Sequence, residues 1–370
     1  MKTCGIIAEY NPFHNGHRYQ IEETRKKTDC DVLIAVMSGN FVQRGEPAVI
    51  SKRKRAEAAV RNGIDAVIEL PYVHAVQGAN GFARGGVRLL QLAGCDQISF
   101  GSECGNLENL MDIADTPVNP EHLREQLDAG MSYPRAYSLL TGSMLPNDIL
   151  AVSYLKEIKD TDIEPVIIQR TTGYSDDTLT ETASALAIRT ALKEKKELLH
   201  STPMEEQLNE DNIIFTDSYY PYLRTLLLTL KKEQLAQYFL MSEGMENHLT
   251  KQAAISPDWN SFLQNSTTYR YTASRIRRCC MHIMNQVTKE EVRKLPELDT
   301  LRVLAFNDTG RQWLKEMRKK EIRVASTFTD VPWPWRQIEY RTALLYASVF
   351  PEEKRQEIIK EELAGAQYIR

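Results

Sequence analysis

The chain has 370 residues, of which 42% are hydrophobic and 26% are charged, with a formal net charge of −4 at pH 7. This size leaves room for two domains, and the slightly acidic balance excludes a protein that binds nucleic acid over its whole surface. Only a local basic patch remains for such a role. No run of about 18 apolar residues predicts a membrane span, and the first residues do not resemble a signal peptide. We therefore expect a cytoplasmic protein.

Apolar runs of strand length alternate with helical segments in the first half of the chain. Because each strand is nearly continuous in apolar residues, the sheet is expected to be parallel and covered on both faces. The pattern predicts a Rossmann-like α/β domain over residues 1–197, followed by a mainly α-helical region over residues 198–370. The predicted strands are residues 3–8, 32–37, 65–70, 96–100 and 164–169, and the predicted helices are 17–28, 51–62, 79–93, 149–158 and 181–197.

One polar string stands between the first strand and the first helix, and it reads EYNPFHNGH from Glu9 to His17. Ligands of a parallel sheet bind beyond the carboxyl ends of its strands, and the N–H groups at a helix start favour phosphate. Gly16 allows a nucleotide to approach the backbone, and the imidazoles of His14 and His17 can donate hydrogen bonds to phosphate oxygens. The string therefore predicts nucleotidyl transfer, in which positioning and electrostatics replace a protein nucleophile.

The two histidines also have structural interpretations. His14 would cap the helix and His17 would pack in the core. A zinc site is disfavoured, because no further Cys or His stands nearby and the six cysteines form no C-x-x-C pair. We predict no structural metal.

The string NPFHNGH resembles the HxGH motif of the nucleotidyltransferase superfamily. Over most of its length, the chain more closely resembles the tRNA(Met) cytidine acetate ligase family. The resemblance is strongest over GIIAEYNPFHNGHRYQIEETR and AVMSGNFVQRGEPAVISKRKRAEAAVRNGIDAVIELP. It continues through FARGGV, ISFGSE, PNDILAVSYLKEI, TASALAIR, RYTASRIRR and RVLAFNDTG.

This resemblance implies an ATP-dependent ligase. Such an enzyme activates acetate as acetyl-adenylate and releases pyrophosphate. It then acetylates N4 of the wobble cytidine in the anticodon loop of elongator tRNA(Met), which gives N4-acetylcytidine. The resemblance implies ATP with Mg²⁺ as the cofactor, and acetate and the tRNA as partners. It implies no membrane and no protein partner.

The resemblance also implies where ATP binds. Gly101, Asn147 and Arg170 are expected to contact it. From the residues alone, a turn glycine, a helix N-cap and a solvated charge are the alternatives. The main ATP-binding segment is expected to comprise Ile7, Ala8, Glu9, Tyr10, Asn11, Pro12, Phe13, His14, Asn15, Gly16, His17, Arg18, Tyr19 and Gln20.

The string SALAIR, residues 184–189, resembles the second signature of the superfamily. Ser184 is expected to bind a phosphate and Arg189 to hold pyrophosphate, which completes a catalytic set with His14 and His17. Leu186 departs from the signature, because it replaces a small hydroxyl residue. An ordinary amphipathic helix is the alternative interpretation.

Residues 268–278 interleave arginines with tyrosines. Arginines contact phosphates and tyrosines stack on unpaired bases, whereas the alternative is a solvated helix face. The expected RNA contacts are Arg270, Tyr271, Arg275, Arg277 and Arg278. The loop of residues 38–47 follows the second strand and is expected to face the same site, but the sequence assigns no role to its residues Asn40, Gln43 and Arg44.

Two other functions remain open from the sequence. A small-molecule adenylyltransferase, with a nucleotide or phosphopantetheine substrate, would share the HxGH chemistry but would not need the region after residue 197. A tRNA- or nucleotide-binding protein with a relic ATP site would not need both histidines, Gly16 and the signature around Ser184 and Arg189.

Overall fold

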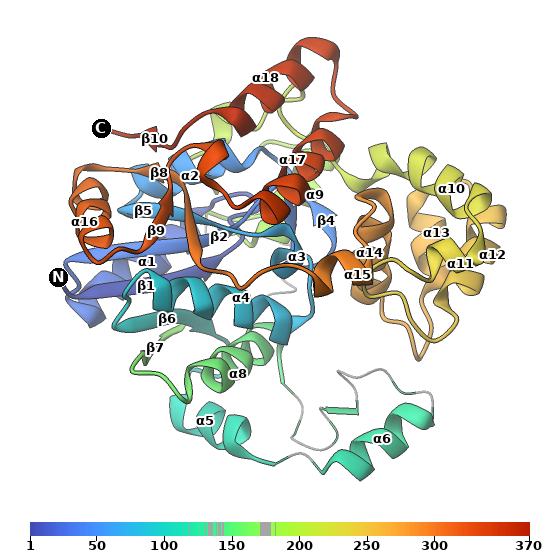
Figure 1. The fold of residues 1–370 in the computed structure, drawn as a ribbon, viewed down its shortest axis with the longest axis horizontal. Helices are drawn as coiled ribbons and strands as arrows, with labels where there is room; N and C mark the ends of the chain where they lie inside the picture. The colour runs from blue at the N-terminus through green and yellow to red at the C-terminus, as the bar shows by residue number, and fades with distance from the viewer. Residues whose placement is uncertain are drawn as a thin grey trace.

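A mixed sheet forms the centre of the molecule (Figure 1). The computed structural model describes residues 1–117, 119–129, 131, 136–137, 139, 142, 144–170, 179–181 and 183–370. In spatial order the strands are β10-β8-β5-β2-β1-β6-β7, and β9 pairs with β8. They comprise β1 (Thr3–Ala8), β2 (Val32–Ser38), β5 (Ala66–Leu70), β6 (Gln97–Ser102), β7 (Glu164–Gln169), β8 (Thr300–Phe306), β9 (Arg323–Ala325) and β10 (Gln367–Tyr368). A separate hairpin joins β3 (Phe41–Val42) and β4 (Glu46–Pro47).

The five strands predicted from apolar runs are confirmed, and they pair in parallel. β2 is buried along its whole length. Successive residues of a strand face opposite sides of the sheet, so that β2 contributes to two cores. Val32, Ile34 and Val36 belong to one core, and Leu33, Ala35 and Met37 belong to the other. The α/β sheet is therefore covered on both faces, as the sequence predicts.

Helices of the first half cover these two faces. α1 and α2 pack on one face, where Ile21 and Ala59 join the core, whereas α4 packs on the other through Val87. The predicted helix at 181–197 contains α9, and residue 182 lies outside the described residues. The helices described in the first half are α1 (Asn15–Thr28), α2 (Lys52–Arg61), α3 (Tyr72–Ala75), α4 (Ala79–Leu92), α5 (Leu107–Asp115), α6 (Pro120–Asp128), α8 (Pro146–Ile158) and α9 (Ala185–Lys193).

Helices α10–α15 form a group beside the sheet, with α14 on the side nearest the sheet, whereas α16 packs on β8 and β2 of the sheet (Figure 1). α14 packs on α10, α13 and β4. The helices of this half are α10 (Tyr220–Thr229), α11 (Lys232–Leu235), α12 (Met245–Ile255), α13 (Trp259–Ser266), α14 (Ala273–Met284), α15 (Lys289–Arg293), α16 (Asp308–Lys319), α17 (Trp333–Ala347) and α18 (Glu352–Leu363), with short 3₁₀ turns at Glu205–Gln207, Thr216–Tyr219 and Phe328–Asp330.

The C-terminal part of the chain returns to the sheet, which the sequence analysis does not predict. β8 pairs antiparallel to β5 and parallel to β9 and β10, so that the sheet is mixed rather than wholly parallel. The run TLRVLAF of β8 is as apolar as the predicted strands, but it stands among helical segments, and the surrounding pattern favours helix. The sheet thus takes strands from both sides of residue 197, and the division into two domains there stays a prediction.

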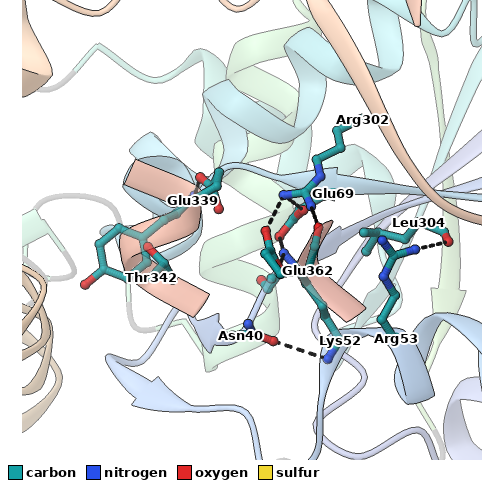
Figure 2. A network of polar contacts seen from close by, with 12 residues as sticks. Asn40, Lys52, Arg53, Glu69, Arg302, Leu304, Glu339, Thr342 and Glu362 are labelled. Atoms are coloured by element: carbon teal, nitrogen blue, oxygen red, sulfur yellow. Dashed lines mark hydrogen bonds and ion pairs between the residues drawn. The ribbon is translucent and has the colours of Figure 1, made fainter. Parts of the chain in front are cut away.

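Buried charges hold this C-terminal part against the sheet (Figure 2). Lys52 of α2 lies 2.5 Å from Glu69 of β5 and 2.7 Å from Glu362 of α18. Arg302 of β8 lies 2.8 Å from the same two carboxylates, and all four side chains are at most 8% exposed. Separating one of these elements from the others would leave a buried charge without its partner, which is strongly unfavourable. The network therefore joins α2, β5, β8 and α18 into one unit.

No helix within the described part of the chain combines the length and the apolar composition that crossing a membrane requires.

Candidate active site

The two histidines of the motif cap α1 through a reciprocal pair of hydrogen bonds. Nδ1 of His14 accepts from the N–H of Gly16 at 3.0 Å, and Nδ1 of His17 accepts from the N–H of His14 at 3.2 Å. Their ring centroids are 3.7 Å apart. A Cβ at position 16 would lie 2.8 Å from Cε1 of His14. Gly16 is therefore required by the imidazole of His14, which lies directly against its backbone.

This capping determines which ring nitrogens carry protons. In a neutral imidazole one nitrogen accepts and the other carries the proton. Since Nδ1 of His14 and Nδ1 of His17 both accept from backbone N–H groups, the proton of each ring belongs on Nε2. The capping interpretation and the catalytic interpretation of the histidines are therefore compatible, because each ring caps the helix with one nitrogen and keeps an N–H donor on the other.

Burial keeps both imidazoles neutral. It lowers the pKa of His14 to about 3, with the positive charges of Arg170 and Arg189 acting in the same direction. Burial also lowers the pKa of His17 well below its ordinary value, and His14 and Arg170 add to this effect. At neutral pH the pair thus offers hydrogen-bond donors without a charge of its own, and the nearby positive charge comes from the two arginines.

The loop between β1 and α1 is anchored from four separate segments of the chain. Oδ1 of Asn11 accepts from the N–H of Val49 at 2.7 Å. Arg189 of α9 donates to the carbonyl of Asn11 at 2.7 Å, and Thr202 donates to the carbonyl of Phe13 at 2.6 Å. The N–H of Asn15 donates to the carbonyl of Ser201, and its side chain donates to the carbonyls of Glu181 and His200. These bonds fix the motif before any ligand binds.

Arg55 of α2 is a further anchor of this loop. Its side chain is 0% exposed. Its guanidinium donates to the carbonyls of Glu9 at 2.5 Å, Ser38 at 3.1 Å and Ile50 at 3.1 Å, and also to that of Gly39. It therefore ties the end of β1 to the end of β2. Sequence patterns give no signal for this role, because a charged residue in a helix usually faces solvent.

Arg170 follows β7 and lies near the imidazoles across the end of the sheet. A Cβ at Gly101, on the neighbouring strand β6, would lie 3.3 Å from Cγ of Arg170. Gly101 therefore makes room for the aliphatic part of this arginine. Both residues line the same cleft as His14 and His17.

Asn147 is not the N-cap of its helix, because α8 starts at Pro146 and its N-cap is Leu145. The carboxylate of Glu103, just after β6, accepts instead from the N–H and the side-chain amide of Asn147, at 3.1 Å and 2.5 Å. It also accepts from the N–H of Asp148. A carboxylate at a helix N-terminus is favoured by the helix dipole, so that Glu103 fixes the position of Asn147 in the cleft.

Ser184 is the N-cap of α9, and its hydroxyl accepts from the N–H of Ala187 at 3.1 Å. Ser184, Leu186 and Arg189 all line the cleft. The SALAIR string is thus both a capped helix start and a wall of the site. The cap leaves the predicted contacts of Ser184 and Arg189 with phosphates as a prediction.

These residues share one cleft of about 1090 Å³. Of the predicted ATP-binding segment, Phe13 is buried in a core and Pro12 is buried beside it, whereas Arg18 and Tyr19 lie on the exposed side of α1. Asn15 anchors the loop through its main-chain and side-chain hydrogen bonds, and Gly16 contributes its backbone N–H. The members that line the cleft are Ile7, Ala8, Glu9, Tyr10, Asn11, His14, His17 and Gln20.

Part of the predicted RNA-binding cluster also lines the cleft. Arg270, Arg275 and Arg278 line it. Arg277 instead forms an ion pair with Glu46 at 2.6 Å, on the β3–β4 hairpin. Tyr271 is only 8% exposed, and its hydroxyl donates to the carbonyl of Glu243 at 2.7 Å. Burial therefore leaves the ring of Tyr271 without an open face for a base, contrary to its predicted role.

The loop of residues 38–47 contributes Val42, Gln43, Arg44 and Glu46 to the cleft. Asn40, in contrast, is buried and accepts from the N–H groups of Ala48 and Lys52. Lys156 of α8 and Lys289 of α15 also line the cleft. The sequence analysis misses these two lysines because they stand far from the motif and within ordinary helical patterns.

Comparisons with known proteins agree with this geometry. The family model of the HIGH Nucleotidyl Transferase matches residues 1–362. The tRNA(Met) cytidine acetate ligase of Geobacillus sp. (strain WCH70) is 37% identical, over 98% of each chain. That of Limosilactobacillus reuteri is also 37% identical, over 96% of this chain and 97% of the relative.

Solved structures lead to the same group of proteins. The apo crystal structure of Thermotoga maritima TmcAL aligns with a TM-score of 0.91 at 31% identity, and it covers 100% of both chains. The structure of the same protein bound to alpha-thio ATP aligns with a TM-score of 0.89.

Proposed function

The chain belongs to the HIGH nucleotidyltransferase family and, within it, to the tRNA(Met) cytidine acetate ligases, and we propose that it uses ATP to acetylate elongator tRNA(Met). It activates acetate as acetyl-adenylate and transfers the acetyl group to N4 of the wobble cytidine in the anticodon loop, which gives N4-acetylcytidine. The observation that carries this proposal is one cleft whose lining includes both the histidines His14 and His17 and the arginines Arg270 and Arg275.

In the first step, an oxygen of acetate attacks the α-phosphorus of ATP, and the bond to the bridging oxygen breaks as pyrophosphate leaves. Negative charge grows on the α-phosphate and on the leaving group. The Nε2–H groups of His14 and His17 donate to this charge, and Arg170 and Arg189 neutralise it. Preorganised donors of this kind commonly supply most of the catalytic effect, so that no protein nucleophile is required.

In the second step, the anticodon loop enters from the side of α14. Single-stranded loops present their bases on a basic surface that contacts the phosphates. Arg270, Arg275 and Arg278 supply this surface, and the cytidine reaches inward to the adenylate. Because tRNA is the substrate, the enzyme would act in the cytoplasm.

Mg²⁺ is proposed only as a companion of ATP. Among the described residues, no group of three or more His, Cys, Asp or Glu side chains could hold a metal ion. The phosphates of ATP would therefore supply the principal ligands of the ion.

The test of this proposal is ATP–pyrophosphate exchange with the purified protein. Exchange that depends on acetate, followed by incorporation of labelled acetate into tRNA, is the expected result. Adenylylation of a phosphorylated small molecule without acetate-dependent exchange would support the small-molecule adenylyltransferase instead. Binding of ATP without turnover of either kind would support a relic site.

A further inference from the structure

Three carboxylates line the cleft, namely Glu9, Glu46 and Glu243. Two of them are neutralised by arginines. Glu46 lies 2.6 Å from Arg277, and Glu243 lies 3.4 Å from Arg270 and 3.6 Å from Arg275. Glu9 forms no ion pair within the described residues, and its Oε1 accepts only from the N–H of Gln43, at 2.6 Å. Glu9 is therefore the carboxylate whose presence in the cleft still needs an explanation.

Glu9 is held firmly at both its main chain and its side chain. Arg55 donates to its carbonyl at 2.5 Å, and the N–H of Gln43 holds its carboxylate. The carbonyl of Gln43 in turn accepts from Arg278 of α14 at 3.4 Å. Glu9 thus lies between the histidine motif, which follows β1, and the basic helix α14, to which Gln43 links it.

A carboxylate at this point is unfavourable for ATP itself. It adds negative charge beside a site built to receive phosphates, where like charges repel. The amine of the cytidine that accepts the acetyl group would instead be favoured by a nearby carboxylate. Its N4–H₂ group is a hydrogen-bond donor, and a Glu carboxylate is the side chain that accepts from this group of cytosine. Acylation of the amine also releases a proton, which a positioned base can take.

We infer that Glu9 accepts the proton of the cytidine amine during acetyl transfer, an inference that rests on the proposed function. The N4 lone pair attacks the carbonyl carbon of acetyl-adenylate and forms the N–C bond. The bond between that carbon and the phosphate oxygen breaks, and AMP leaves with the electron pair. The proton from N4 passes to the free oxygen of the Glu9 carboxylate, so that the step needs no further reactant.

The surroundings of Glu9 adapt it to this role. Burial raises the pKa of its carboxyl above the ordinary value, while the N–H of Gln43 and the charges of Arg44 and Arg189 oppose the rise. A raised pKa makes a carboxylate a stronger base near neutral pH. The other titratable or charged groups that act on Glu9 or are affected by it are Glu46 on the hairpin, Tyr154 of α8 and Arg55 of α2.

The test compares two acceptors in the same reaction mixture. Hydroxylamine in excess intercepts acetyl-adenylate without a base supplied by the protein, whereas the cytidine amine requires one. With saturating tRNA, Glu9→Gln is expected to lower the ratio of acetylated tRNA to acetohydroxamate roughly 100-fold, the usual effect of removing a general base. Both products form from the acetyl-adenylate that folded enzyme makes. Partial unfolding of a variant therefore lowers both products equally and leaves their ratio unchanged.

Two further variants sharpen the test. Glu9→Asp keeps a carboxylate and should restore the ratio to within about tenfold of the wild type. Glu22→Gln removes one carboxylate from the exposed side of α1, outside the cleft lining, and should leave the ratio near the wild-type value. A wild-type ratio in Glu9→Gln, or an equal loss in Glu9→Gln and Glu9→Asp, would overturn the inference. If the wild type forms hydroxamate but never acetylates tRNA, the proposed function fails and the inference fails with it.

Discussion

His14 and His17 each perform two tasks with one ring. Nδ1 caps α1 and Nε2–H remains for a ligand. The sequence predicted the pair and its place after the first strand. It could not predict the tautomers, because these depend on backbone N–H groups whose direction only the folded loop defines. Nor could it predict that Gly16 accommodates the His14 ring.

This double role yields a prediction that separates catalysis from stability. Asn is an excellent N-cap, whereas Ala is not. His14→Asn should therefore fold nearly as stably as the wild type, yet lose roughly 100- to 1,000-fold in acetate-dependent exchange, as expected when one donor to a developing charge is removed. His14→Ala should lose the same activity and an additional ~1 kcal/mol of stability in urea unfolding. Exchange at the wild-type rate in His14→Asn would refute the role of this imidazole.

Arg55 marks the limit of sequence reasoning at this scale. Its four acceptors are backbone carbonyls of residues 9, 38, 39 and 50. Every residue has a backbone carbonyl, so a side chain that binds only carbonyls leaves no recognisable pattern in the sequence. In the predicted RNA-binding cluster, by contrast, the sequence pattern was visible but did not show which side chains share a surface. Their spacing suggested one surface, but Arg277 turns to Glu46 and Tyr271 turns into the core.

At the scale of elements, the five parallel strands were predictable because each is an uninterrupted apolar run between helices. β8 has the same kind of run but pairs antiparallel to β5, 230 residues or more away in the sequence. Such pairing depends on long-range contacts that local periodicity does not encode. The packing of α14 on β4 likewise depends on contacts between segments that are far apart in the sequence.

The orientation of α14 predicts which arginines bind RNA. Arg270→Ala combined with Arg275→Ala removes two cleft arginines and should weaken tRNA binding, with a salt dependence reduced by about two in the slope of log K against log salt concentration. Arg277→Ala, the matched control, removes an arginine that does not line the cleft and should change the slope less. Titration of labelled tRNA at several salt concentrations measures both. A larger effect from Arg277→Ala would reverse the assignment of the surface.

At the scale of the whole molecule, the buried charge network joins the C-terminal helices to the nucleotide-binding sheet (Figure 2). Glu339 of α17 lies next to it and accepts from the N–H of Tyr72 at 2.7 Å. Burial, together with the charge of Glu69, raises the pKa of Glu339 to about 8. The folded protein therefore holds this proton at pH values where the unfolded chain has released it.

This proton predicts how stability changes with pH. Because the folded state binds more protons than the unfolded state between about pH 4.5 and 8, Glu339 makes the free energy of unfolding fall as the pH rises through this range, by at most about 1.4 kcal/mol per pH unit. Glu339→Gln keeps an acceptor for Tyr72 but cannot ionise. The variant should gain stability over the wild type as the pH rises from 5 to 8 in urea unfolding series. A difference between the two that does not change with pH would contradict the protonated state of Glu339.

One cleft of the molecule is lined both by the imidazoles of His14 and His17 and by the arginines Arg270 and Arg275, and the proposed function rests on this arrangement. The most direct test is nucleoside analysis of an elongator tRNA(Met) transcript after incubation with the protein, ATP and labelled acetate. The proposed function predicts labelled N4-acetylcytidine at the wobble position only, formed with release of AMP and pyrophosphate. A transcript whose wobble cytidine is replaced by uridine should carry no label. Acetyl-adenylate formation with no labelled nucleoside in the wild-type transcript would contradict it.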